Sequence, residues 1–326
     1  MKIAIVGAGG IGSTLGAKLA LAGHQVSLLA RGANLGVLAT EGLRLVDDVD
    51  ELTGRLRLPA SDRAADVGPQ DLVIIALKSH QIPEVVAGLA PLLAPHTTVV
   101  PAINGLPWWY FERHGGPHEG LRLRTLDPAG TLAAARMAHR VIGCVVHIAA
   151  ELQAPGEVRH TGGRRLILGE LDGTMSERLA AIAGALREAR FEAVESPHIR
   201  LDVWTKLIGN LSFNPIAALT GYRMNQICAD EDVLGVIRNI MREGMAVAEK
   251  VGIRVAMTPD ERIDIARQLG SAKISMLQDL EQRRRMELDG IVASVIELGE
   301  QLDVPMPVTR MVLALTLGRA RALGIG

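Results

Sequence analysis

The sequence predicts an α/β fold in which a doubly wound parallel sheet comes first and an all-helical domain follows. Three observations carry this prediction. Short apolar runs rich in Val and Ile alternate with helical patterns over the first third of the chain. A glycine-rich stretch directly follows the first of these runs. After Pro197 the helical patterns continue almost without a break. Strands that alternate with helices form a parallel sheet covered on both faces.

The first domain is expected over residues 1–196. Apolar runs predict its parallel strands at 2–7, 24–30, 71–77 and 97–103. Helical patterns between them predict helices at 11–21 and 81–93. The rest of the domain is predicted to contain a polar-edged hairpin at 41–57, a β-rich segment at 140–170, a helix at 176–189 and a strand at 191–196.

The second domain is expected over residues 197–326. Its helices are predicted at 200–213, 230–251, 259–269, 275–301 and 309–323. The third of these has a clear start, because Thr258 is a favoured cap and Pro259 is favoured at the first helical position.

Composition excludes several classes of function. The formal net charge is −1, with no basic arm or acidic tail, so neither nucleic acid nor an anionic membrane is an expected partner. No apolar run reaches the roughly 18 residues that a membrane helix needs. Two cysteines cannot form a disulfide framework, which favours a reducing compartment and a cytoplasmic protein. Cys144 and His147 lack a second pair of ligands, so no metal site is expected.

The stretch "GAGGIG" places three glycines in G-x-G-x-x-G spacing between the first strand and the first helix. The first permits a tight turn, the second lets the backbone approach a pyrophosphate, and the third lets helix and strand pack closely. The helix N-terminus adds N–H donors for phosphates. The alternative is a tight turn without a ligand. We expect a Rossmann-type dinucleotide site with cofactor contacts along the stretch, from Gly7, Ala8, Gly9, Gly10, Ile11 and Gly12.

The end of the second strand decides which dinucleotide fits. A site that prefers NAD places Asp or Glu there, to bind the ribose hydroxyls. This strand ends in Ala30 and Arg31 instead. Because an Arg can pair with a 2′-phosphate, we expect NADP(H) as the cofactor. The alternative is that Arg31 is an ordinary surface residue.

Two further strand ends carry polar side chains. Lys78 and Gln81 follow the strand at 71–77, and Asn104 with Gly105 follows the strand at 97–103. Ligands bind at the carboxyl ends of parallel strands in such folds. The alternatives are a solvated Lys at a helix start and a generic Asn–Gly turn.

Lys206, Asn210 and Asn214 are each four residues apart in an otherwise apolar helix. This spacing places all three on one face. Hydride delivery from NADPH to a ketone leaves charge on the oxygen, and a Lys facing that oxygen can donate a proton or stabilise the alkoxide. The two Asn side chains can hold substrate oxygens. The alternative is a Lys that snorkels at the edge of a helix.

A carboxylate near Lys206 would keep the ammonium group charged and oriented in a cleft of low dielectric. The stretch "SMLQDLEQRRRMELDG" offers Ser275, Glu287 and Asp289 as polar candidates. Spacing alone does not distinguish Glu287 from Glu281 or Asp279.

The residues described so far resemble the ketopantoate reductases (2-dehydropantoate 2-reductases) of the 6-phosphogluconate-dehydrogenase-like superfamily. The resemblance covers nearly the whole chain. The glycine loop, Arg31, "LK-x-x-Q" and "NG" occur in the order typical of the family, and "PGEVRHTG" resembles its middle hairpin. Two stretches are the most specific, "W-x-K-L-x-x-N-x-x-x-N-P" from Trp204 to Pro215 and "SMLQDLE…E-x-D" from Ser275 to Asp289.

The resemblance implies a Rossmann domain and a helical domain with the site between them. It implies reduction of 2-dehydropantoate to (R)-pantoate by NADPH, on the route to pantothenate and coenzyme A. Lys206 would be the proton donor and would touch the substrate, and Glu287 would be catalytic at the junction of cofactor and lysine. Further cofactor contacts would come from Lys78, Gln81, Asn104 and the backbone of Ala149. Further substrate contacts would come from Asn104, Asn210, Asn214, Asn225 and Ser275.

The expected partner is a small 2-oxoacid, and the long helices of the second domain could pair in a homodimer. Two other functions stay open: an NADPH-dependent reductase of a different 2-oxoacid or carbonyl compound, and a non-catalytic NADP(H)-binding sensor. The presence of both Lys206 and Glu287 argues against the sensor. The run Trp108–Phe111 either lines the substrate pocket or packs as a cap or subunit contact. The run Arg283–Arg285 either forms a solvated face or meets an anionic substrate or the cofactor phosphates.

Overall fold

The computed structural model describes residues 1–325, and the chain divides into two compact units. Unit 1 comprises residues 1–103, 111–120 and 129–199. Unit 2 comprises residues 104–110, 121–128 and 200–326. Two short segments from the middle of the chain therefore belong to the C-terminal unit. The domain boundary near residue 196 stays a prediction.

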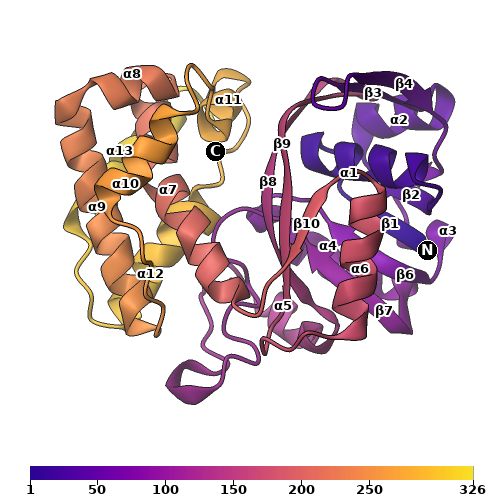
Figure 1. Cartoon of the computed structure of the whole chain (residues 1–326), viewed down its shortest axis with the longest axis horizontal. Helices are drawn as coiled ribbons and strands as arrows, with labels where there is room; N and C mark the ends of the chain where they lie inside the picture. The colour runs from indigo at the N-terminus through magenta and orange to yellow at the C-terminus, as the bar shows by residue number, and fades with distance from the viewer. Residues whose placement is uncertain (326) are drawn as a thin grey trace. The chain divides into compact units, whose positions relative to one another are not determined.

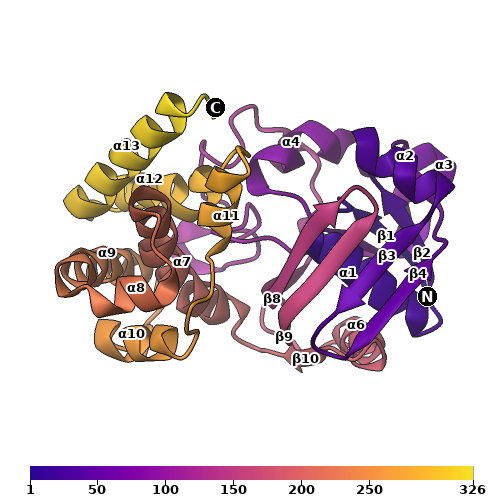
Figure 2. The ribbon, with the colours of Figure 1, turned by 90° about the horizontal axis from the view of Figure 1, so that it is seen from above.

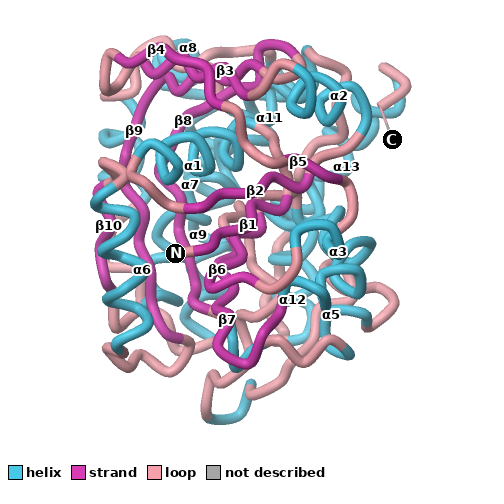
Figure 3. Tube along the Cα trace, turned by 90° about the vertical axis from the view of Figure 1, so that its right-hand side faces the viewer, coloured by secondary structure: helices cyan, strands magenta, loops and turns pink. Residues whose placement is uncertain are grey.

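Unit 1 contains a parallel sheet of five strands in the order β5-β2-β1-β6-β7 (Figure 3). The strands are β1 (Lys2–Val6), β2 (Gln25–Leu29), β5 (Ala60–Ser61), β6 (Gln70–Ile75) and β7 (Leu93–Pro101). Strands β1 and β6 are buried along almost their whole length, as expected where helices cover both faces. The predicted α/β class is confirmed.

The carboxyl ends of four neighbouring strands lie in register. Val6 at the end of β1 pairs with Leu29 of β2 and with Ile75 of β6. Ile75 in turn pairs with Pro101 of β7. The loops that follow these strands therefore begin at the same edge of the sheet, which is where parallel sheets bind ligands.

The helices of unit 1 differ in part from the prediction. They are α1 (Gly10–Leu21), α2 (Gly32–Thr40), α3 (Ala64–Val67), α4 (Ile82–Val85), α5 (Thr131–Ala134) and α6 (Glu177–Glu188). The helical stretch predicted at 81–93 is present, but only α4 within it is α-helical, and 3₁₀ turns at Ser79–Gln81 and Val86–Leu92 flank it. Pro91 removes a backbone donor and Gly88 weakens the helix, so the α-helix ends early. Helix α2 was missed.

A second sheet lies beside the first and has the order β10-β9-β3-β4, with β8 paired to β9. Its strands are β3 (Leu43–Asp47), β4 (Leu52–Leu56), β8 (Ile142–Ala154), β9 (Glu157–Glu170) and β10 (Glu192–Glu195). The predicted hairpin at 41–57 is confirmed by the antiparallel pair β3–β4. Strands β8 and β9 form a long hairpin (Figure 1). Helix α1 packs against both sheets, so the element that follows the glycine loop is enclosed.

The regular secondary structure of unit 2 is entirely helical among the described residues (Figure 2). Its α-helices are α7 (Ile199–Thr220), α8 (Met224–Ala229), α9 (Glu231–Lys250), α10 (Pro259–Arg267), α11 (Ser275–Glu281), α12 (Ser294–Gln301) and α13 (Pro307–Ala322). Helix α9 packs on α8, α10, α12 and α13, and its Gly244 lies against Leu211 and Ile208 of α7. Thr258 caps α10 as predicted, since its side chain accepts the N–H of Glu261. Among the described residues, no helix combines the length and apolarity that crossing a membrane requires.

The prediction of one continuous helix at 275–301 is wrong. Helix α11 ends at Glu281, and the chain resumes as a π-helical turn, η5 (Asp289–Ala293), that leads into α12. Arg283 adopts a left-handed φ of 53°, and the N–H groups of Arg283 and Arg284 bond back to the carbonyls of Leu280 and Asp279. This pair of bonds is a Schellman motif, which ends a helix. The motif was not predicted because its left-handed residue is usually Gly.

A buried ionic cluster joins α1 to the second sheet. Lys18 Nζ donates to Asp47 Oδ2 at 2.9 Å, and His160 Nδ1 donates to Asp47 Oδ1 at 2.9 Å. Lys18, Asp47 and His160 are 3%, 2% and 0% exposed, so the charges have little access to water. Burial alone would raise the pKa of Asp47. The hydrogen bonds from Lys18 and the Asp50 backbone, with the charges of His160 and Lys18, outweigh burial and hold this pKa below its ordinary value.

We predict that Asp47→Asn destabilises the protein by about 3 kcal/mol at neutral pH, because the buried ammonium group of Lys18 loses one of its two carboxylate partners, Asp47 and Asp50. The free energy of unfolding in denaturant measures the effect. Because the folded pKa of Asp47 is lowered, its contribution is present above the unfolded value of 3.8 and is lost as the pH falls further. The difference between variant and wild type should therefore shrink in acid.

Asp48→Asn is the matched control, because Asp48 pairs with Arg159 in an exposed ion pair one residue along the chain. It should change stability by less than about 1 kcal/mol. Equal losses in the two variants would contradict the role given to the buried cluster.

Candidate functional site

The glycine loop between β1 and α1 is closely packed at two positions and open at the third. Gly7 has a left-handed φ of 102°, and a Cβ there would overlap the carbonyl of Ala76. A Cβ on Gly12 would overlap the carbonyl oxygen of Gly7. At Gly9 nothing lies within 4 Å of the Cβ position. The loop therefore fits a phosphate group that approaches the backbone at Gly9.

The N-terminus of α1 supports the same interpretation. Gly9 occupies the N-cap position, where it has no side chain to accept from the first-turn N–H groups. The first turn also contains no acidic residue. The donors of this twelve-residue helix are therefore available to an anion that the positive end of the helix attracts.

The hairpin β8–β9 lies against the glycine loop. A Cβ on Gly10 would overlap the backbone carbonyl of Ala150, so strand and loop are in direct contact. The neighbouring residue Ala149 is exposed, and its carbonyl accepts a hydrogen bond from Thr161 Oγ1 at 3.2 Å. The structure thus brings Ala149 close to the predicted cofactor loop.

Three candidates of unit 1 follow the carboxyl ends of β2 and β6, the two strands that flank β1. Arg31 is exposed and precedes α2, two residues beyond the end of β2, and no acidic side chain occupies this strand end. Lys78 and Gln81 form a tight turn after β6. The Gln81 Oε1 accepts from the Lys78 N–H at 3.1 Å, and the Gln81 N–H donates to the Lys78 carbonyl at 2.9 Å.

In unit 2, Lys206 of α7 and Asn104 form a direct hydrogen bond. Lys206 Nζ donates to Asn104 Oδ1 at 2.7 Å, and both side chains are half-buried. Asn104 begins a loop over residues 104–110, and this loop packs on the π-helical turn. Leu106 N–H donates to the Gly290 carbonyl at 2.8 Å. Gly105 has a left-handed φ of 84°, and a Cβ there would overlap Gly290, so only glycine fits.

The same loop leads from Lys206 towards the segment that carries Glu287. Its first residue bonds to Lys206, and its next two contact Gly290, three residues after Glu287. Glu287 is 9% exposed, and its carbonyl accepts the N–H of Ile291 at 3.1 Å. π-helical turns inside α-helices occur frequently at functional sites.

Three of the acidic candidates form ion pairs within their own segment. Asp279 bonds to Arg284 at 3.2 Å, Glu281 to Lys273 at 2.6 Å, and Asp289 to Arg285 at 2.7 Å. Each of these three carboxylates is therefore neutralised by a basic residue of its own segment. The arginines of the run 283–285 are all exposed.

Most side chains of the aromatic run Trp108–Phe111 are packed in the interior. Trp109, Tyr110 and Phe111 are at most 2% exposed, whereas Trp108 is half-buried. The Tyr110 hydroxyl accepts from Trp204 Nε1 at 2.8 Å, and the Tyr110 carbonyl accepts from Arg200 Nε at 2.8 Å. Burial raises the pKa of Tyr110 well above its usual range, so the hydroxyl stays protonated. These bonds hold the end of the loop to α7, at positions two and six residues before Lys206. The sequence did not reveal this anchor.

The other predicted substrate contacts are more scattered. Asn210 is half-buried and Asn214 is buried on α7, in the register that the four-residue spacing requires. Asn225 is exposed on α8, and Ser275 is exposed as the first residue of α11.

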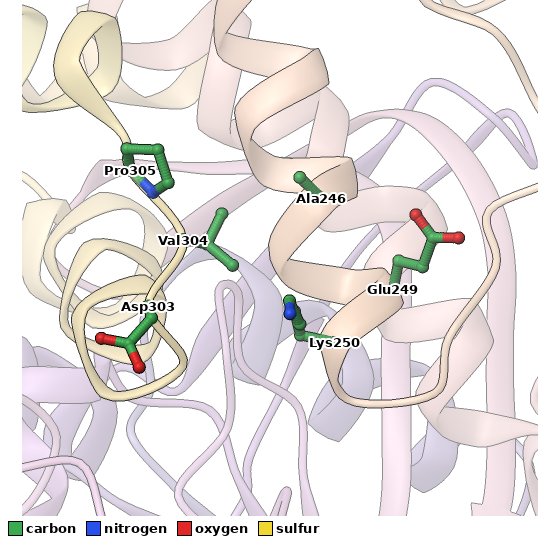
Figure 4. A pocket seen from close by; sticks show the side chains of 6 residues that line it. All are labelled: Ala246, Glu249, Lys250, Asp303, Val304 and Pro305. Carbon is green, nitrogen blue, oxygen red and sulfur yellow. The ribbon is translucent and has the colours of Figure 1, made fainter.

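A surface pocket of about 480 Å³ lies elsewhere on unit 2 (Figure 4). Its lining comes from the end of α9 and the segment before α13, and consists of Ala246, Glu249, Lys250, Asp303, Val304 and Pro305. None of the candidate residues lines it. Within residues 1–325, no group of three or more potential ligands is arranged to hold a metal ion.

A Rossmann-type sheet with an open glycine loop, followed by a helical unit that holds a half-buried Lys, defines a class of dinucleotide-dependent oxidoreductases. Two family models match the chain. The model described as ketopantoate reductase PanE/ApbA matches residues 3–173, and its C-terminal model matches residues 198–320.

Known proteins match over almost the full length. A 2-dehydropantoate 2-reductase from Mesorhizobium japonicum is 46% identical over 316 residues, covering 97% of this chain and 96% of the relative. The crystal structure of a protein assigned as a ketopantoate reductase from Ralstonia solanacearum MolK2 superposes with a TM-score of 0.95 at 43% identity, covering 100% and 99% of the two chains. A 2-dehydropantoate 2-reductase from Geobacter metallireducens GS-15 has a TM-score of 0.85 at 27% identity, covering 98% and 99%.

The chain belongs to the ketopantoate reductase family. It is an oxidoreductase that acts on CH–OH groups, of the 2-dehydropantoate 2-reductase type. The resemblance stated from the sequence is thereby confirmed.

Proposed function

We propose that the protein reduces 2-dehydropantoate to (R)-pantoate with NADPH, on the route to pantothenate and coenzyme A. The ketopantoate reductase family uses NADPH, and the residues of this chain fit that cofactor. The observation that carries the proposal is the hydrogen bond from Lys206 to Asn104, because it holds a proton donor beside an amide that can bind a substrate oxygen.

Different residues of unit 1 would contact different parts of the cofactor. The stretch Gly7–Gly12 and the N-terminus of α1 would hold the pyrophosphate, and Arg31 would pair with the 2′-phosphate. Lys78, Gln81 and the backbone of Ala149 would complete the contacts. When bound, NADPH supplies the hydride to the carbonyl carbon of the substrate.

Lys206 would supply the proton. An ammonium group only donates, so Asn104 must present its amide oxygen to Lys206 and direct its NH₂ group elsewhere. That NH₂ group can donate to a substrate oxygen while Lys206 gives a proton to the carbonyl oxygen. The O–H bond of the product would form as an N–H bond of Lys206 breaks, and the neutral Lys206 would regain its proton from solvent. The carboxylate of Glu287 would favour the charged lysine before the reaction.

Substrate recognition would fall to polar side chains of unit 2. Asn210 and Asn214 share the face of α7 with Lys206, and Ser275 and Asn225 would add hydroxyl and amide contacts to the substrate oxygens.

The half-buried Trp108 favours one alternative, a reductase whose pocket accepts a different 2-oxoacid. The cytoplasmic location stays a prediction.

A homodimer through unit 2 is part of the proposal. Helix α13 exposes Met311 and Leu315, one turn apart, at 63% and 58%. An exposed apolar stripe of this kind is typical of a surface that another protein covers. A ketopantoate reductase from Staphylococcus aureus, similar in fold at 17% identity with a TM-score of 0.73, is described as dimeric.

We predict that Lys206→Ala lowers kcat for 2-dehydropantoate by about 100-fold or more, because general acid catalysis contributes on that order. NADPH should still bind, since Lys206 lies outside the glycine loop. Steady-state rates and a fluorescence titration of NADPH measure the two effects.

Two further variants make this test specific. Lys206→Arg keeps the positive charge, but a guanidinium does not release its proton at neutral pH, so kcat should stay low. Lys250→Ala removes a lysine of the same unit that lines the pocket of Figure 4 and should leave kcat unchanged. Near-normal turnover by Lys206→Ala would rule out the assigned proton donor, and recovery by Lys206→Arg would reduce its role to electrostatics.

We predict that Arg31→Ala weakens NADPH binding about 10- to 100-fold and NADH binding much less, because a charged hydrogen bond to the 2′-phosphate is lost. Dissociation constants for the two nucleotides give the ratio. Arg57→Ala is the control, since Arg57 is an exposed arginine bonded to Thr40 at the far end of α2. If NADPH and NADH lose affinity equally, Arg31 does not select the cofactor.

A further inference from the structure

Asn34, in the first turn of α2, joins the glycine loop to the β8–β9 hairpin. Its Nδ2 donates to the carbonyl of Ala8 at 2.8 Å, and its Oδ1 accepts the N–H of Gly156 at 2.7 Å. The amide nitrogen and the amide oxygen of Asn34 thus each bond to a backbone group of a different segment. Asn34 was not among the candidates from the sequence.

The hairpin end of this bridge is firmly held. Gly156 has a left-handed φ of 71°, and a Cβ there would overlap the side chain of Val37 on α2. The Gly156 carbonyl accepts the N–H of Arg44 at 2.8 Å, which ties the turn to β3. The turn at residues 155–156 therefore provides a rigid support from which Asn34 reaches the glycine loop.

At the glycine loop, the hydrogen bond from Asn34 fixes the plane of the Ala8–Gly9 peptide. Ala8 is 5% exposed, and its carbonyl points at Asn34. In a trans peptide the carbonyl and the following N–H point in opposite directions. The bond from Asn34 therefore directs the N–H of Gly9 away from α2, at the one glycine where the space beyond the backbone is open. The contact of Gly10 with Ala150 is a second point at which the same hairpin restrains the loop.

We propose that Asn34 is a positioning residue for the dinucleotide site, which orients the Ala8–Gly9 peptide for the pyrophosphate and couples the loop to the β8–β9 hairpin. The inference rests on the proposed use of NADPH. It assigns Asn34 a different role from Arg31. The pyrophosphate is common to NADPH and NADH, so loss of Asn34 affects both nucleotides alike, whereas loss of Arg31 affects mainly NADPH.

The test compares Asn34→Ala with wild type in the full-length protein. We expect the dissociation constants of NADPH and NADH, measured by fluorescence titration, to rise by the same factor of about 10, because a partly buried hydrogen bond to the loop is lost. KM for NADPH should rise with them, while kcat at saturating NADPH stays within about 2-fold of wild type. Asn34→Gln keeps the amide and should recover part of the affinity.

Thr40→Ala is the matched control. Thr40 belongs to the same helix and donates to the Gly36 carbonyl at 2.9 Å, but it does not reach the loop. It should leave both dissociation constants unchanged. Thermal denaturation of each variant shows whether the fold is retained.

Three results would overturn the proposal for Asn34. The first is wild-type affinity for both nucleotides in Asn34→Ala. The second is a loss confined to NADPH, which would place Asn34 at the 2′-phosphate. The third is an equal effect of Thr40→Ala. If the wild-type protein itself binds no NADPH, the proposed cofactor fails rather than the role of Asn34.

Discussion

The candidate site of unit 2 depends on one hydrogen bond, from Lys206 Nζ to Asn104 Oδ1. The 104–110 loop that presents Asn104 is held on both sides of this bond. Gly105 and Leu106 contact the π-helical turn, and Tyr110 is fixed to Trp204 and Arg200 of α7. An ammonium group in a half-buried place needs an oxygen acceptor, and the loop is shaped to provide it. The buried aromatic residues therefore serve the site indirectly, because they fix the loop that carries the acceptor.

In unit 1, close backbone contacts hold the glycine loop in place, as hydrogen bonds hold the 104–110 loop in unit 2. The glycine loop approaches Ala76 and Ala150 so closely that side chains at Gly7 and Gly10 would not fit. These contacts hold a short loop rigid around the one glycine that remains open. A loop held in this way loses little entropy when a phosphate binds, which favours affinity.

Features set by local chemistry could be predicted from the sequence. The strands of the parallel sheet are continuous apolar runs because both of their faces are buried, and the glycine spacing indicates a strand-to-helix turn that approaches a phosphate. The start of α10 was evident because Thr258 and Pro259 combine two independent signals. Lys206, Asn210 and Asn214 were grouped correctly on α7 because helical spacing alone decides which residues share a face.

Features set by tertiary contacts could not be predicted. The end of α11 depends on a left-handed Arg283, which the sequence does not distinguish from a helical arginine. Spacing alone did not distinguish Glu287 from Glu281 or Asp279, and the ion pairs of those two carboxylates with Lys273 and Arg284 depend on the fold. Asn34 resembles an ordinary helix-start residue until the chain brings Gly156 within reach of its side chain, more than a hundred residues later.

The central claim is that this site reduces 2-dehydropantoate. The most direct measurement is the rate of NADPH oxidation, followed by absorbance, with 2-dehydropantoate and with a small panel of other 2-oxoacids. The account predicts that kcat/KM is highest for 2-dehydropantoate. Tight binding of NADPH without turnover of 2-dehydropantoate, together with efficient reduction of another 2-oxoacid, would contradict it and make that 2-oxoacid the substrate.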